Sequence, residues 1–219
     1  MLSWDPAKGL LSPDVDLGPG YVIDDGVLIG YPTGRKIAVP RTVIGPGARL
    51  RSGTIIYAGS TIGRNLETGH GTIIREENTI GDDVQIWSYS VIEYGCRIGS
   101  RVKIHGLTIM GQFTTVEDDV FISARVVIAN DVHPGCPMAH DCMQGPIIRR
   151  GAQIGAGVAL LPRIEIGEYA LIGAGSVVTH DIPPYAVAYG NPARVHGTIQ
   201  ELTCRTGRRE KPYAHLLGS

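Results

Sequence analysis

Four side chains of the kinds that bind transition metals lie within a single ten-residue stretch of the sequence. They are His133, Cys136, His140 and Cys142. Two cysteines and two histidines form the donor set of many structural zinc sites. The spacing differs from the usual pair-and-pair pattern, and Pro134, Gly135 and Pro137 stiffen the intervals. We therefore interpret these cysteines as plain loop residues and expect no metal, with zinc binding kept as the alternative.

The same stretch belongs to a longer segment, residues 129–147, that interrupts an otherwise regular pattern. Asn130, Asp131 and His133 lie close to its beginning. It is the most polar and most ionisable segment of the repeat region. Loops that leave repeat arrays commonly carry the binding chemistry. We therefore predict that this insertion carries the functional site.

The regular pattern is an apolar residue at every sixth position. Before the insertion these repeat positions are Ile44, Leu50, Ile56, Ile62, Thr68, Ile74, Ile80, Ile86, Ile92, Ile98, Ile104, Met110, Val116, Ile122 and Ile128. After it they are Ile148, Ile154, Leu160, Ile166, Ile172 and Val178. A period of six fits neither an α-helix, which needs 3.6, nor a flat strand, which needs 2. It is typical of a parallel β-helix with one hexapeptide per wall.

This pattern predicts an all-β fold built from stacked three-walled coils. A single coil cannot bury its own apolar edge, so coils must stack, with parallel strands about 4.8 Å apart. The repeat position and the residue four places later are both predicted to point inward. Glycine often follows a repeat position, as at Gly45 and Gly63. We interpret these glycines as a sign of tight turns that need a permissive backbone.

The chain divides into three parts on the same evidence. Residues 1–43 lack the six-residue phase and are rich in Asp, Gly and Pro, so we predict an N-terminal cap of short strands. Residues 44–195 form the predicted β-helix domain, with the inserted loop at 129–147. Residues 196–219 are a C-terminal tail, expected to be a short helix or disordered.

Bulk properties exclude several classes of function. The net charge is −1, which favours neither nucleic acid nor an anionic membrane as a partner. No apolar run approaches 18 residues, so no membrane span is expected. The first residues, 1–6, do not resemble a signal peptide. Four cysteines in 219 residues do not suggest a disulfide scaffold. We expect a cytoplasmic protein.

Several motifs together resemble the hexapeptide-repeat acyltransferases. They are the repeat positions, the loop opening at residues 130–134, the segments 154–157 and 172–178, and the ending 181–184 with 190–195. The resemblance covers roughly residues 44–195. It implies a left-handed β-helix that assembles as a homotrimer and moves an acetyl group from acetyl-CoA to a hydroxyl or amine. The chain is most similar to the sugar acetyltransferases, which implies a sugar or nucleotide-sugar acceptor, in particular the amino group of a nucleotide-linked amino sugar.

The resemblance also implies roles in the inserted loop. His133 matches the catalytic histidine of the galactoside-type O-acetyltransferases, whose role is general base. Imidazole suits this role because much of it is neutral near pH 7, and such a base contributes about 10²–10⁴-fold. Asn130 and Asp131 resemble the start of the same loop in the amino-sugar enzymes, where Asn130 would hold the acceptor amine or orient His133. If the amine arrives unprotonated, His133 would only position substrate.

For acetyl-CoA, the resemblance implies a site on the last coils. The small positions against which a pantetheine arm would lie are Gly155, Ala156, Gly173 and Ala174. Thr179 and Arg194 match positions near the adenosine and phosphate end, where an arginine can make bidentate contacts. The family often has lysine where this chain has His180, so a phosphate contact at that position is not expected.

Other functions stay open at this point. O-acetylation of a sugar hydroxyl is the main alternative to N-acetylation. A γ-class carbonic anhydrase shares the β-helix but binds zinc through three histidines, whereas His105 stands alone on its coil. A non-catalytic scaffold would not need so polar an insertion. The sequence identifies neither the acceptor nor the length of the acyl group.

Overall fold

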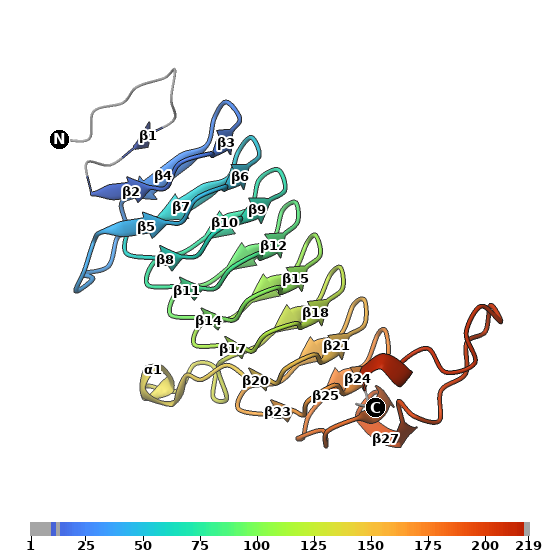
Figure 1. Ribbon diagram of the computed structural model, residues 1–219. Coiled ribbons are helices and arrows are strands. Elements are labelled where there is room, and N and C mark those ends of the chain that lie inside the picture. The colour runs from blue at the N-terminus through green and yellow to red at the C-terminus, as the bar shows by residue number, and fades with distance from the viewer. Residues whose placement is uncertain (1–9, 12–13, 217–219) are drawn as a thin grey trace.

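The computed structural model describes residues 10–11 and 14–216 as a stack of triangular coils (Figure 1). Residues 1–6, on which the absence of a signal peptide was argued, lie outside the described part. Three sheets, which we call A, B and C, form the three walls of the stack. All strand pairs within them are parallel except the last pair of sheet C, which is antiparallel.

The strands are short and follow one another around the three walls. Sheet A contains β1 (Leu10–Leu11), β4 (Leu28–Tyr31), β7 (Ile55–Tyr57), β10 (Ile73–Ile74), β13 (Val91–Ile92), β16 (Ile109–Met110), β19 (Val127–Ile128), β22 (Ala159–Leu160) and β25 (Val177–Val178). Sheet B contains β2 (Val15–Leu17), β5 (Thr42–Ile44), β8 (Thr61–Ile62), β11 (Thr79–Ile80), β14 (Arg97–Ile98), β17 (Thr115–Val116), β20 (Ile147–Ile148) and β23 (Glu165–Ile166). Sheet C contains β3 (Val22–Ile23), β6 (Arg49–Leu50), β9 (Glu67–Thr68), β12 (Gln85–Ile86), β15 (Lys103–Ile104), β18 (Phe121–Ile122), β21 (Gln153–Ile154), β24 (Leu171–Ile172), β26 (Ala186–Gly190) and β27 (Ala193–Thr198).

The repeat positions point into the stack, as the six-residue period predicts. Ile92 pairs with Ile74 on one side and with Met110 on the other, so the three lie above one another on the same wall. All three are fully buried. The residues four places after the repeat positions, such as Val84 and Cys96, are buried as well. Full burial of each large apolar side chain contributes about 1.5–3 kcal/mol, which is the main stabilisation of a stack of such short strands.

The glycines that follow repeat positions have a different physical reason from the predicted one. The left-handed backbone falls three residues after a repeat position, where non-glycine residues such as Leu107 (φ 63°) and Phe113 (φ 58°) also adopt it. Gly45, one residue after a repeat position, does not have a positive φ. A Cβ there would lie 2.6 Å from the backbone of Gly63 on the next coil. These glycines therefore allow successive coils to approach each other.

The N-terminal segment adds to the same three sheets. Strands β1, β2 and β3 pair with β4, β5 and β6, so the sheets extend back beyond the predicted boundary at residue 44. An additional loop, residues 32–41, leaves the stack between β4 and β5 and hides the six-residue phase in the sequence. The described part of the predicted cap therefore forms a first coil.

Both loops that leave the stack do so at the same edge. We call this edge the A–B corner, meaning the turns that lead from sheet A to sheet B at residues 57–60, 75–78, 93–96 and 111–114. The loop 32–41 leaves between β4 and β5, and the insertion 129–147 leaves between β19 and β20. The insertion contains the short helix α1 (Ala139–Cys142), which projects from the stack in Figure 1.

The C-terminal end closes the last coil with an antiparallel hairpin. Strands β26 and β27 form this hairpin, and the 3-10 helix η1 (Ala214–Leu216) follows it. The predicted tail therefore begins as a strand, because β27 continues to Thr198. Among the described residues, none of the helices combines the length and the apolar character that crossing a bilayer requires.

Candidate active site

His133 lies on the exposed part of the insertion. The carboxylate oxygen Oδ1 of Asp131 accepts a hydrogen bond from the backbone N–H of His133, at 2.9 Å. The imidazole itself is exposed and makes no hydrogen bond to any described residue. Asp131 therefore fixes the backbone that carries His133, and leaves both ring nitrogens free to exchange a proton with a ligand.

Asn130 occupies a different environment from its neighbours in the loop. Its backbone carbonyl accepts a hydrogen bond from the N–H of Gln144, at 2.7 Å, which ties the start of the insertion to its end. Its side-chain nitrogen Nδ2 is buried and has no hydrogen-bond partner among the described residues. No hydrogen bond joins Asn130 to His133, so the geometry gives no support to the idea that Asn130 orients the imidazole.

Contacts to the stack fix the end of the insertion. The side-chain nitrogen Nε2 of Gln144 donates to the carbonyl of Phe113, at 3.2 Å, on the coil before the insertion. Arg163, on the coil after it, donates from Nε and Nη2 to the carbonyl of Cys142, at 3.2 and 3.0 Å. The loop is therefore anchored at its base, while its central part, with His133, is exposed.

The geometry does not favour the zinc alternative. No group of three or more His, Cys, Asp or Glu side chains within the described residues is arranged to hold a metal ion. Cys136 is exposed, and its sulfur accepts a hydrogen bond from the N–H of Met138, at 3.4 Å. His133, His140 and Cys142 do not converge on it.

Four of the six residues expected to bind acetyl-CoA lie together. Gly155 and Ala156 follow β21, and Gly173 and Ala174 follow β24, in neighbouring turns that lead from sheet C to sheet A. Gly155, Gly173 and Ala174 line a shallow cavity of about 230 Å³, which Phe121 also lines. A Cβ on Gly155 would lie 2.6 Å from the backbone nitrogen of Ala174. Gly155 therefore allows these two coils to approach each other, as Gly45 does.

The other two residues lie elsewhere on the last coils. Thr179 follows β25 and is therefore on the far side of sheet A from that cavity; its Oγ1 lies 2.8 Å from Nδ1 of His180. Arg194 is exposed on β27 and donates from Nη1 to the carbonyl of Ala193, at 2.9 Å. The structure therefore brings together the predicted pantetheine positions, but not the predicted phosphate positions.

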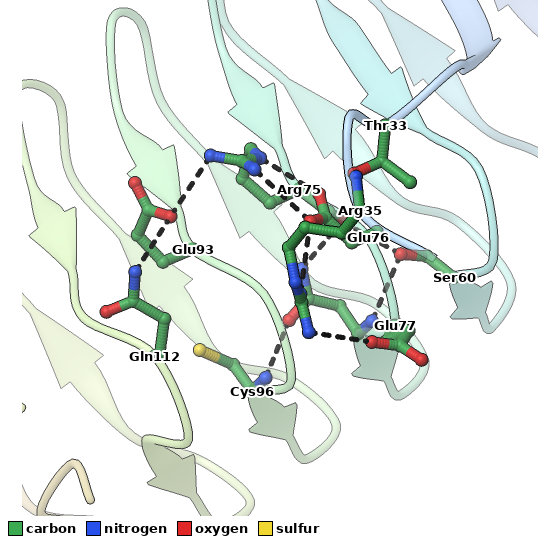
Figure 2. Close-up of polar contacts among 10 residues, drawn as sticks. Thr33, Arg35, Ser60, Arg75, Glu76, Glu77, Glu93, Cys96 and Gln112 are labelled. Carbon is green, nitrogen blue, oxygen red and sulfur yellow. Dashed lines mark hydrogen bonds and ion pairs between the residues drawn. The ribbon is translucent and has the colours of Figure 1, made fainter. Parts of the chain in front are cut away.

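A polar cluster on the A–B corner was not predicted. The carboxylate of Glu76 is fully buried and accepts hydrogen bonds from Arg75 (Nε at 2.9 Å, Nη2 at 3.2 Å) and from Nη1 of Arg35, at 3.1 Å (Figure 2). Arg35 comes from the loop 32–41 and lies over the ring of Tyr94, with its guanidinium carbon 3.6 Å from the ring centroid. This loop is thus held against the wall by one buried carboxylate.

The same cluster extends toward the insertion. Arg75 also donates from Nη1 to Oε2 of Glu93, at 3.4 Å, and Gln112 donates from Nε2 to the same oxygen, at 3.3 Å. Burial alone would raise the pKa of Glu76, but hydrogen bonds from Arg75 and Thr33 outweigh it and hold that pKa below its usual value. The only sequence signal for this cluster was three consecutive charged residues, 75–77, inside an apolar repeat.

Comparison with known proteins fits this arrangement. The family description "Bacterial transferase hexapeptide (six repeats)" matches residues 79–112 and 145–180. These segments are bacterial transferase hexapeptide repeats. A solved UDP-N-acetylglucosamine acyltransferase from Bacteroides fragilis superposes with a TM-score of 0.71, over 86% of this chain and 72% of that one, at 21% identity. The left-handed β-helix expected from the sequence is therefore confirmed.

Two curated relatives are more similar in sequence over shorter stretches. A dTDP-3-amino-3,6-dideoxy-α-D-galactopyranose 3-N-acetyltransferase of Aneurinibacillus thermoaerophilus is 47% identical over 76 residues, 30% of this chain and 40% of that protein. A serine acetyltransferase of Escherichia coli is 39% identical over 89 residues, 41% of this chain and 30% of that protein. The chain thus spans less than half the length of either relative. Both relatives are acetyltransferases, as the resemblance led us to expect.

Proposed function

We propose that this protein transfers an acetyl group from acetyl-CoA to a sugar, and that the acceptor is the amino group of a nucleotide-linked amino sugar. The observation that carries the proposal is the 47% identity to a sugar N-acetyltransferase over 76 residues. The exposed His133 on an anchored loop and the glycine-lined cavity of the last coils support it. Both features are what a base and a thioester cofactor need.

The proposed reaction uses each part of the site in turn. The acceptor nitrogen attacks the thioester carbonyl, the carbon–sulfur bond breaks, and CoA leaves as a thiolate. His133 takes the proton that the nitrogen loses and returns it to the departing sulfur, which completes the balance. The imidazole nitrogens suit this shuttle because no described residue hydrogen-bonds to them. The pantetheine arm would lie in the shallow cavity that Gly155, Gly173 and Ala174 line.

A homotrimer is part of the same proposal. Sheet A presents an apolar residue outward on every coil from β7 to β25. Ile109 and Val127, which are neighbours in this stripe, are each 48% exposed. From β8 to β23, sheet B presents threonine, arginine and glutamate at the corresponding places, with Ile147 as the apolar exception. A second copy of this chain would cover the apolar stripe, which is the usual role of such a face.

Assembly would also complete the site. Within one protomer, the insertion that carries His133 follows sheet A at one edge. Ala156 and Ala174 lie in the turns at the other edge of the same sheet. A neighbouring copy packed on sheet A would bring the insertion of one protomer toward the glycine turns of the other. Light scattering should report a trimer, and Ile109→Glu should yield monomers with little activity. A fully active monomer would contradict this part of the proposal.

A second function, O-acetylation, has a specific observation in its favour, since a serine acetyltransferase matches 41% of the chain. The two are separated by measuring release of CoA thiol with a panel of nucleotide amino sugars, simple galactosides and serine, followed by mass spectrometry of the product. The proposal predicts saturable turnover with an amino sugar and an N-acetyl product. Turnover with hydroxyl acceptors alone would establish O-acetylation instead.

We further propose a cytoplasmic location. Acetyl-CoA is made in the cytoplasm, and free cysteines, such as the four described here, persist there.

A further inference from the structure

Three polar side chains form a row along the A–B corner, on three successive coils. Glu93 follows β13, Gln112 lies in the turn after β16, and Asn130 lies in the segment after β19. These strands are neighbours in sheet A; Gln112 and Asn130 occupy equivalent positions on successive coils, and Glu93, one position earlier on its coil, contacts Gln112 directly. The row ends three residues before His133. Successive coils are about 4.8 Å apart.

Glu93 and Gln112 each have hydrogen-bonding capacity that no residue within 10–11 and 14–216 uses. Oε2 of Glu93 accepts from both Arg75 and Gln112. The other carboxylate oxygen points away from both donors (Figure 2) and has no partner among the described residues. The amide oxygen of Gln112 likewise has none. A carboxylate is an acceptor for up to four hydrogen bonds, so one oxygen of Glu93 remains available to a ligand.

Asn130 adds an unpaired donor to the same row. Its Nδ2 is buried without a partner. A buried donor left unpaired is costly, and native proteins rarely keep one without a purpose. Because Nδ2 is buried, a ligand at the corner does not reach it. The row therefore offers a ligand two acceptors, Glu93 and Gln112, which hydroxyl and amino groups of a sugar satisfy by donating.

The rest of the polar cluster holds this row in place. Arg75, which donates to Glu93, is fixed by two hydrogen bonds to Glu76 and lies over the ring of Tyr57, 5.0 Å from its centroid. The fixed guanidinium orients Glu93. A carboxylate held in this way favours a ligand whose hydroxyl groups donate hydrogen bonds to it.

We propose that Glu93 and Gln112 form the subsite for the ring of the acceptor, with both side chains accepting hydrogen bonds from its hydroxyl groups and with Asn130 beside them on the following coil. This proposal rests on the proposed function and specifies where its acceptor binds. Arg75 and Glu76 act as positioning residues for Glu93. The acceptor ring lies along the corner, and its amine is directed toward His133.

Steady-state kinetics with the best acceptor of the panel tests the subsite. Glu93→Gln removes the charge and keeps the shape, and we expect the acceptor KM to rise at least about tenfold, as for loss of a charged hydrogen bond, with the KM for acetyl-CoA unchanged. Glu93→Asp should restore part of the loss. Gln112→Ala should raise the acceptor KM by a smaller factor. It removes only one hydrogen bond within the protein, so it tests the row even if Glu93→Gln lowers stability.

Glu117→Gln is the matched control. Glu117 also directly follows a repeat position and accepts a hydrogen bond from an arginine, Arg149 at 2.8 Å, but it lies between sheets B and C. An unchanged acceptor KM in both Glu93→Gln and Gln112→Ala, or an equal rise in Glu117→Gln, would overturn the subsite. Absence of turnover by the unmodified protein with every acceptor would instead contradict the proposed function, and the subsite with it.

Discussion

The buried carboxylate of Glu76 should contribute measurably to stability, and Glu76→Gln tests this. The substitution removes the charge to which Arg35 and Arg75 donate three hydrogen bonds. Breaking a buried ion pair costs about 3–5 kcal/mol. The two arginine side chains are 38% and 28% exposed, so water compensates part of that loss, and we expect about 2–3 kcal/mol. For a chain of this size the melting temperature should fall by roughly 4–12 °C.

The next residue along the chain supplies a matched control. Glu77 is 35% exposed, and Arg35, at 3.6 Å, is its ion-pair partner among the described residues. Glu77→Gln changes the net charge by the same amount but disrupts a partly exposed pair, so the melting temperature should change by less than about 2 °C. Thermal unfolding of both variants at one heating rate gives the comparison. Equal shifts in the two would refute the reasoning.

The pH dependence provides a second check on the same residue. The pKa of Glu76 is lower in the folded protein than its ordinary value of 4.5. Its ionised form therefore stabilises the fold above the unfolded-state pKa, and this contribution is lost as the pH falls through the folded-state pKa. The difference in melting temperature between the unmodified protein and Glu76→Gln should be full at pH 7 and shrink below about pH 4.5. A difference that stays constant down to pH 3 would contradict the assignment.

Three further results are expected. His133→Ala should lower kcat/KM by about 10²–10⁴-fold without changing the melting temperature, because the side chain is exposed; an unchanged rate would mean that the amine loses its proton by another route. Ala174→Phe should raise the KM for acetyl-CoA with little loss of stability, since Ala174 is exposed beside the cavity, and an unchanged KM would argue against a cofactor there. Iodoacetamide at pH 7.5 should modify Cys204 well before Cys96. A hydrogen bond from Thr206 lowers the pKa of Cys204 to about 7, whereas burial raises the pKa of Cys96 to about 12. Peptide mass mapping gives the order of modification, and the reverse order would contradict this prediction.

The stack itself could be predicted because its determinants are local. Ile74, Ile92 and Met110 share a wall for the simple reason that each hexapeptide makes one side of a triangle, so three repeats return the chain to the same place. Even Thr68, the polar repeat position, stays in register, because its hydroxyl pairs with that of Thr54 at 2.8 Å inside the stack. No long-range information is needed for such a fold.

The parts that the sequence did not reveal depend on contacts between distant residues. The cluster around Glu76 needs Arg35, 41 residues earlier, and the loop that delivers it also hides the phase of the first coil. The base of the insertion is fixed by Gln144 and Arg163 through backbone carbonyls, which have no sequence signature. Thr179 and Arg194 were placed by resemblance alone, and their roles at the phosphate end of the cofactor stay predictions.

The most direct test of the proposed acetyl transfer is a titration of coenzyme A into the purified protein, followed by amide hydrogen exchange. It requires no knowledge of the acceptor. We predict saturable binding, with slowed exchange concentrated in residues 155–157 and 173–175 and in the insertion 129–147. Absence of binding at millimolar coenzyme A, or protection confined to the first coils, would contradict the proposal that this β-helix uses acyl-CoA.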